Sequence, residues 1–362
     1  MNLRIPGPTP VPDEVLAAGS RQMMNHRGPE FAQILRRVTD GLNWVFDTSS
    51  DVLSFTTSGT GGLEVAVVNT LSPGDRVLSV SIGSFGDRLK SIAKTYGADV
   101  VSYALEWGEA ADPEVIGKML DEEPAIKAVL VTHNETSTGT TNPLEAIAKA
   151  VRSRNRLIIV DAVSSMSSIP CPVERWDLDV VVSGSQKGWM APPGLAFVYM
   201  SERAWAANAE ARMPRFYFDA AKTRDSLAKL QNPWTPAVSV YYAMDAAFEL
   251  LRAEGLEGIF TRHQAIADYT RRRAKSLGLK LVPVDERFAS NTVTAVWWPD
   301  GVDGKAISKR AREEFGVVLG GGQGKLEGKI FRVGHLGYVS LGDAEECMDV
   351  VEKLLSEAKL TV

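Results

Sequence analysis

Short apolar runs rich in β-branched residues alternate with helical patterns through the first two thirds of the chain. Strands that are joined by helical crossovers favour a mostly parallel sheet with helices on both faces. In such sheets, ligands bind beyond the carboxyl ends of the strands. The predicted fold class is therefore α/β, with strands at 76–81, 99–103, 125–132, 156–161, 178–182 and 195–200 and helices at 62–70, 85–96, 113–121 and 143–153.

The pattern changes after residue 239, where two long helical stretches, 239–254 and 256–277, lie on either side of Gly255. Strands and helices then mix, which is typical of a smaller α+β domain. Its predicted strands are 280–284, 292–298 and 329–333, and its predicted helices are 304–315 and 343–359. The proline-rich start indicates an extended arm. We expect an N-terminal arm (1–20), a large domain (21–254) and a small C-terminal domain (255–362).

Composition excludes several classes of protein. A chain of 362 residues can bury a large core. Its net charge of −5 gives no reason to expect nucleic acid as a partner. No apolar run approaches the length of a membrane span. Cys171 and Cys347 lie far apart without CxxC spacing, so we expect neither a disulfide framework nor a metal site, and a reducing cytoplasm is the simplest location.

Lys187 is the most informative residue of the chain. It lies in Ser183-Gly184-Ser185-Gln186-Lys187-Gly188, directly after the apolar run 178–182. An amine at the carboxyl end of a buried strand could form a Schiff base with a carbonyl cofactor. It could equally be a lysine of a surface loop. The hexapeptide alone leaves both interpretations open.

Three other strand ends carry polar residues at the same edge of the predicted sheet. The turn Ser58-Gly59-Thr60-Gly61 precedes a helix and could face a phosphate or be a plain helix cap. Asp161 could hold a cationic ring nitrogen or cap a turn. The stretch 132–139 offers hydroxyls and an amide, while His133 and Glu135 lack the further ligands that a metal site needs. We interpret His133 as a structural hydrogen-bonding residue.

The order of these features carries more information than any one of them. A small-residue turn is followed by the aromatic Phe85, the hydroxyl of Thr136, the acid Asp161 and the amine Lys187. Pyridoxal phosphate needs such a set: a phosphate cradle, a ring stack, a partner for the pyridinium and a Schiff-base amine. Order and spacing together therefore predict a site for this cofactor.

The chain resembles the class V, fold-type I aminotransferases, above all the alanine–glyoxylate and serine–glyoxylate (serine–pyruvate) aminotransferases. The resemblance runs from Pro6-Gly7-Pro8-Thr9 to Phe331-Arg332-Val333-Gly334 and is most specific in 58–61, 136–139 and 183–187. It implies a fold-type I sheet, pyridoxal 5'-phosphate, and transamination of alanine or serine with glyoxylate or pyruvate as acceptor. It also implies a homodimer with shared active sites.

Residue by residue, the resemblance assigns roles. Lys187 forms the Schiff base and moves the proton, and Asp161 pairs with the ring nitrogen. Arg332 grips the substrate carboxylate, in a pocket bordered by Pro6, Gly7 and Thr136. The remaining cofactor contacts are Phe85 on the ring, Thr136 on the ring hydroxyl, Gly59, Thr60 and Gln186 on the phosphate, Ser58 and Val163 nearby, and Thr235 reaching the phosphate in the neighbouring subunit.

Departures from the family pattern leave the substrate open. Several relatives have tryptophan in place of Phe85 and serine in place of Thr136, and some have a tyrosine near Asn232 that this chain lacks. Another donor, aspartate or 2-aminoethylphosphonate, remains an alternative, with Arg27 as a candidate second anion site or a plain surface residue. A cysteine desulfurase would need a mobile cysteine near the substrate, which neither cysteine provides. We interpret the turn 320–325 as a flexible turn beside the substrate entrance.

Overall fold

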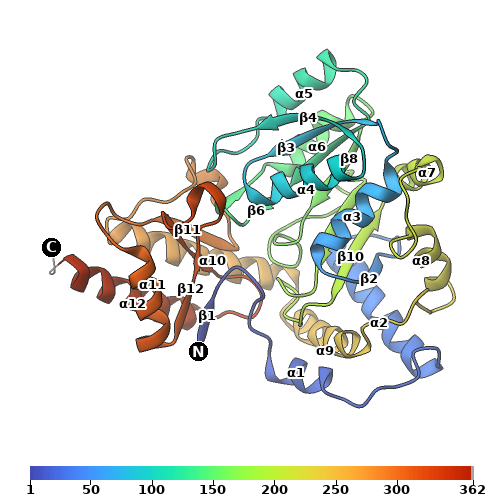
Figure 1. The fold of residues 1–362 in the computed structure, drawn as a ribbon. Helices are drawn as coiled ribbons and strands as arrows, with labels where there is room; N and C mark the ends of the chain where they lie inside the picture. Colours follow the sequence, from blue (N-terminus) through green and yellow to red (C-terminus); the bar gives the residue numbers. More distant parts are fainter. Residues whose placement is uncertain (360–362) are drawn as a thin grey trace.

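A seven-stranded sheet forms the larger part of the molecule in the computed structural model, which describes residues 1–359 (Figure 1). All of its strands run parallel except β10, which is antiparallel to both neighbours. The order across the sheet is β2 (Leu53–Thr56), β10 (Leu195–Met200), β9 (Val180–Gly184), β8 (Leu157–Asp161), β5 (Ala128–Thr132), β3 (Arg76–Ser81) and β4 (Asp99–Ala104).

The central strands are buried along their whole length because helices cover the sheet. Every residue of β5, β9 and β10 is buried, in keeping with their mostly apolar sequences rich in valine. The helices of this part are α1 (Asp13–Gly19), α2 (Pro29–Phe46), α3 (Gly59–Thr70), α4 (Ser84–Thr95), α5 (Pro113–Glu122), α6 (Leu144–Arg152), α7 (Glu202–Glu210), α8 (Ala220–Leu227) and α9 (Val238–Glu254).

A second, four-stranded sheet lies beside the first with a hydrophobic core of its own. Its order is β1 (Asn2–Arg4), β12 (Val317–Gly321), β13 (Ile330–Gly334) and β11 (Val293–Trp297), with only β1 and β12 parallel. Trp298 and Phe331 meet in its core with ring centroids 4.3 Å apart. The accompanying helices are α10 (Leu256–Ser276), α11 (Gly304–Phe315) and α12 (Leu341–Lys359).

Several predicted elements differ from the structure. The stretch 280–284 is not a strand: Leu281 makes only an isolated bridge to Val296, and Val284 is 75% exposed beside Pro283. The helix predicted from residue 62 begins at Gly59, because Ser58 is already its N-cap. The strand at 125–132 begins at Ala128.

The proline-rich start is extended through Pro12, as expected, and residues 2–4 of it form β1 in the sheet of the C-terminal part. Helix α1 follows at residues 13–19 and packs against α9. In Figure 1 the first strand lies among the last strands of the chain. The division into an arm and two domains stays a prediction, and its last three residues lie outside the described part.

The described part of the chain also contains four short elements. They are β6 (Asn134–Glu135) paired with β7 (Thr140–Thr141), and the 3₁₀ turns Glu286–Phe288 and Gly324–Leu326. Among residues 1–359, no helix has both the length and the apolar character needed to cross a membrane.

Candidate active site

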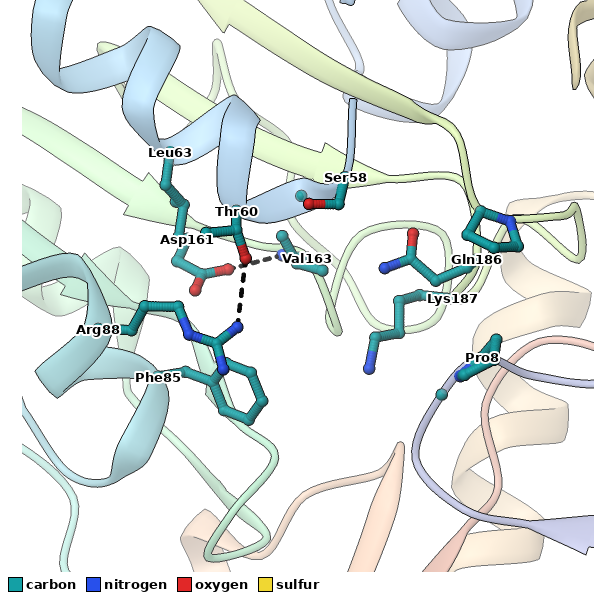
Figure 2. A pocket seen from close by; sticks show the side chains of 13 residues that line it. Pro8, Ser58, Thr60, Leu63, Phe85, Arg88, Asp161, Val163, Gln186 and Lys187 are labelled. Carbon is teal, nitrogen blue, oxygen red and sulfur yellow. Dashed lines mark hydrogen bonds between the residues drawn. The ribbon is translucent and has the colours of Figure 1, made fainter. Parts of the chain in front are cut away.

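A cavity of about 300 Å³ lies where the parallel strands end (Figure 2). β2, β3, β5, β8 and β9 all direct their carboxyl ends to this edge, so the segments that follow them meet here. Nine residues of the predicted site line the cavity: Gly7, Ser58, Gly59, Thr60, Phe85, Asp161, Val163, Gln186 and Lys187.

Lys187 extends its side chain into the middle of the cavity from the turn after β9 (Figure 2). Its Nζ donates to the carbonyl oxygen of Pro6 at 2.7 Å. Burial lowers the pKa of this amine to about 8, partly opposed by the negative charge of Asp161. Gly7 fits beside it only because it lacks a side chain, since a Cβ there would lie 2.5 Å from Nζ. The N-terminal arm therefore forms the wall next to the lysine.

Asp161 approaches the cavity from the opposite side, at the end of β8 (Figure 2). Its Oδ1 accepts the backbone N–H of Val163 at 3.0 Å. Burial raises its pKa to about 6, while the bond from Val163 and the charges of Arg88 and Lys187 work in the other direction. The carboxylate is therefore mostly ionised at neutral pH and has no cation within ion-pair distance among the described residues.

The amino terminus of α3 forms one end of the cavity. In the first hydrogen bond of the helix, the Gly62 N–H donates to the backbone carbonyl of Ser58. The N–H groups that precede Gly62 in the turn are therefore free for a ligand. The Ser58 hydroxyl makes no capping bond. Gln186 lines the same end, and its Oε1 is buried without a partner in the described part of the chain. A Cβ at Gly59 would lie 2.8 Å from Val163.

Phe85 lies in the first turn of α4 and is accompanied by Arg88 one turn later. The Arg88 guanidinium lies 4.7 Å from the centre of the Phe85 ring and donates to Thr60 Oγ1 at 3.2 Å. Arg88 thus brings a second positive charge to the cavity wall. In the sequence, only the position of Arg88 one helical turn after Phe85 indicated a role at the site, and Arg88 was not predicted.

Thr136 and Arg332 are buried but do not line this cavity, although Arg332 is near enough for its charge to lower the pKa of Lys187. Arg332 Nη1 donates to the Thr136 carbonyl at 2.9 Å, and Nε donates to the Gly321 carbonyl at 2.8 Å. Burial lowers the pKa of Arg332 to about 10. The Thr136 hydroxyl donates to Ser164 at 2.9 Å, and Ser164 in turn bonds Asn134. Ser164 follows the Asp161 strand but carried no separate signal in the sequence.

Thr235 and Arg27 lie away from the cavity of their own chain. Thr235 is exposed and lines a separate small pocket. Arg27 donates to Gln231 Oε1 and to the carbonyls of Asn232 and Pro233, which holds the segment that carries Thr235. In this chain Arg27 therefore serves that segment, without lining the cavity.

Two further expectations can be compared with the structure. The His133 backbone makes hydrogen bonds to Asp161 and Asn142, but its side chain does not act as expected: Nδ1 is buried without a partner among the described residues, and the ring packs edge-on against Trp176 at 5.9 Å. The stretch 320–325 is not simply a turn: residues 320–321 end strand β12, and a 3₁₀ turn begins at Gly324. It does lie beside the site, since Gly321 accepts from Arg332 and a Cβ at Gly320 would lie 2.9 Å from Pro6. Cys171 and Cys347 are both buried, and neither lines the cavity.

The sheet, the smaller mixed sheet and the lysine at a strand end define a class, the fold-type I α/β proteins. The profile described as Aminotransferase class-V matches residues 2–333, and the chain belongs to this family. Membership implies pyridoxal phosphate as cofactor.

Individual relatives cover nearly the whole chain. It is 44% identical to the soluble hydrogenase small subunit of Synechococcus sp., over 99% of this chain and 94% of that protein. It is 39% identical to the L-aspartate–glyoxylate aminotransferase of Paracoccus denitrificans, over 94% and 87%. The solved structure of an alanine–glyoxylate aminotransferase from Nostoc sp. superposes with a TM-score of 0.93 at 32% identity, over 98% and 94%.

Proposed function

We propose that this chain transfers the amino group of a small amino acid, alanine or serine, to glyoxylate or pyruvate with pyridoxal phosphate. One observation carries the proposal. The buried amine of Lys187 and the buried carboxylate of Asp161 face a common cavity whose end is the amino terminus of α3. Similarity to the alanine–glyoxylate aminotransferase of Nostoc sp. supports the choice of substrates.

The residues present fit the cofactor. Free N–H groups at the start of α3, the Ser58 hydroxyl and the NH₂ group of Gln186 would donate to the phosphate. Phe85 and Val163 would enclose the ring, and Asp161 would face its nitrogen. When bound, pyridoxal phosphate supplies an aldehyde for the substrate amine and a ring that accepts electrons.

The chain's own groups then have definite tasks. Lys187, once released by the incoming amine, is a base with its pKa near 8 and can carry a proton to and from the substrate Cα. Asp161 supplies the buried negative charge that keeps the ring nitrogen protonated. Arg332 is held by two carbonyls through Nε and Nη1, which leaves Nη2 for the substrate carboxylate. The Thr136 carbonyl fixes the direction of that guanidinium.

We propose further that the working unit is a homodimer. Thr235 lies beside an exposed aromatic stack in which the Phe216 and Trp234 ring centroids are 4.9 Å apart, and Phe216 is 68% exposed. Exposed apolar patches of this kind mark protein interfaces. This placement supports a role for Thr235 at the phosphate of the partner's site.

A second candidate is the same reaction with an acidic donor such as aspartate. Arg88 supports it, because a second guanidinium at the cavity wall could face a second carboxylate. The Paracoccus denitrificans relative acts on aspartate by its name. For the hydrogenase name of the Synechococcus relative, residues 1–359 offer no such supporting observation, since no three or more of their His, Cys, Asp or Glu side chains are grouped so that they could hold a metal ion.

A screen of single amino acids tests the proposal. Purified protein loaded with pyridoxal phosphate should be yellow, and each amino acid is mixed with it while the visible absorbance is followed. Rapid loss of the yellow band with alanine or serine is expected. Response to aspartate alone would select the second candidate, and a protein that does not take up the cofactor would overturn both.

A further inference from the structure

The carboxylate of Glu135 is fully buried directly behind the candidate site, and none of the tasks described above uses it. It accepts four hydrogen bonds. Oε2 accepts the backbone N–H groups of Phe85 at 3.0 Å and Gly86 at 3.1 Å. Oε1 accepts the N–H of Ser137 at 3.0 Å and its hydroxyl at 2.6 Å. No cation lies within ion-pair distance of it in the described part of the chain.

These bonds join the two walls of the site. Phe85 belongs to the first turn of α4, and Ser137 belongs to the loop after β5. The Ser137 hydroxyl adds a second link, because it also accepts the N–H of Ser84 at 3.0 Å. The contact is close: a Cβ at Gly83 would lie 2.5 Å from the Glu135 side chain. One carboxylate therefore fixes the spacing between the helix that carries Phe85 and the loop that carries Thr136.

The same loop reaches the substrate-binding arginine. Thr136 lies between Glu135 and Ser137 in the chain, and its carbonyl accepts Arg332 Nη1. Glu135 also acts on Arg332 by its charge, which raises the pKa of that guanidinium against the effect of burial. A displacement of the loop would thus move Phe85, the Thr136 hydroxyl and the Arg332 guanidinium together.

We propose that Glu135 is a positioning residue that sets the width of the cofactor slot and the direction of Arg332. The inference rests on the proposed function, since it assumes that the slot holds pyridoxal phosphate. A carboxylate suits the task because both of its oxygens accept and neither donates. Burial raises the pKa of the Glu135 carboxyl, while the hydrogen bonds from Ser137 and Gly86 act in the opposite direction and stabilise its negative charge.

Glu135→Gln is the informative variant because the amide keeps the shape but offers only one oxygen. Either its NH₂ group faces the N–H groups of Phe85 and Gly86, or it faces the N–H of Ser137. In each case buried donors meet donors, and one wall must shift.

Asp179→Asn is a matched control. Asp179 is also fully buried and accepts from Ile158 N, Ser201 Oγ and Arg203 Nε, but it precedes β9 at the opposite edge of the sheet. Both variants are expected to lower the melting temperature.

The experiment measures pyridoxal phosphate dissociation, the visible circular dichroism of the bound cofactor, and the KM for the amino donor. Glu135→Gln should weaken cofactor binding about tenfold or more, alter the dichroism and raise KM. Asp179→Asn should leave all three unchanged. Ser137→Ala removes the hydroxyl's link to Ser84 and its bond to Glu135, but it keeps the three backbone bonds to the carboxylate. It should shift all three quantities in the same direction by less, and it serves as the test if Glu135→Gln does not fold.

The outcomes are distinct. Dissociation constants within twofold of wild type in Glu135→Gln, or equal losses in Asp179→Asn, would reduce Glu135 to an ordinary helix cap. If Glu135→Gln does not fold, unchanged binding in Ser137→Ala would do the same. Failure of the wild-type protein to bind pyridoxal phosphate would instead overturn the proposed function.

Discussion

A lysine amine attacks an aldehyde only when it has lost its proton, so the surroundings of Lys187 decide how it reacts. Burial and the charges of Arg332 and Arg88 lower its pKa, whereas Asp161 raises it. The hydrogen bond to Pro6 holds the amine in the middle of the cavity.

The rate at which the protein captures pyridoxal phosphate should therefore rise as the pH passes through about 8, well below the value of an ordinary lysine. Removing the charge in Asp161→Asn should move this midpoint to lower pH, since that charge favours the protonated amine. Stopped-flow absorbance at a series of pH values measures both. A midpoint near 10, or a shift to higher pH in the variant, would contradict the assignment.

The variant Arg332→Lys tests whether the planar guanidinium of Arg332 is needed to bind the substrate carboxylate. The charge remains, but the planar set of donors that bonds Gly321 and Thr136 is lost, so kcat/KM for amino acids should fall about a hundredfold while cofactor binding persists. Arg27→Lys, away from the cavity, is the matched control and should leave the KM unchanged. Equal effects in both variants would remove Arg332 from substrate binding.

At the level of single residues, the sequence predicted those residues of the candidate site that directly follow strands. Lys187, Asp161 and Gly59 line the cavity because strand ends meet at one edge of a parallel sheet. Arg88 and Ser164 could not be predicted, because their place at the site depends on the direction in which their side chains point from a helix and a turn. Glu135 was visible as a residue, but its four donors come from segments that only the folded chain brings together.

Helix α3 shows what an element contributes that single residues do not. Its first N–H groups point into the cavity only because Gly59 lets the helix begin against Val163. The proposed phosphate site therefore depends on the residue at which the helix begins.

Gly59→Ala should push the first turn away from Val163, because its Cβ would lie 2.8 Å from that side chain. We expect the affinity for pyridoxal phosphate to fall about tenfold or more, and the affinity for pyridoxal, which lacks the phosphate, to change much less. Gly342→Ala in the first turn of α12, where the nearest atom is 3.7 Å away, is the control. Equal losses for both ligands would argue against a phosphate cradle.

Apolar periodicity predicted most strands and helices to within a few residues because the central strands are buried on both faces. It failed at 280–284, where an apolar run with Pro283 stays exposed outside the sheet. It also missed β1 and its pairing with β12, since three residues beside prolines carry no periodic signal. That pairing depends on contacts between the two ends of the chain.

In the proposed homodimer, each active site includes residues of both chains if Thr235 contacts the phosphate in the partner's site. Thr235→Asp should then weaken cofactor binding by placing a carboxylate near the partner's phosphate, although Thr235 lines no part of its own cavity. Thr95→Asp, at another exposed threonine, should have no effect.

Mixing inactive Lys187→Ala and Thr235→Asp chains gives the decisive measurement. Random exchange makes about half of the dimers mixed, and one site in each mixed dimer is intact, so activity should recover to about a quarter of wild type. Absence of recovery after verified subunit exchange would place the complete site within a single chain.

The strand β1 also joins parts of the chain that are made at different times. Residues 2–4 are made long before residues 317–319, which are their neighbours in the sheet. The wall beside Lys187 therefore has two anchors: β1 in the smaller sheet, and Thr9, which bonds the backbone of Gln186 and Lys187. A chain that lacks β12 would keep only the second anchor, so its lysine would be held less firmly.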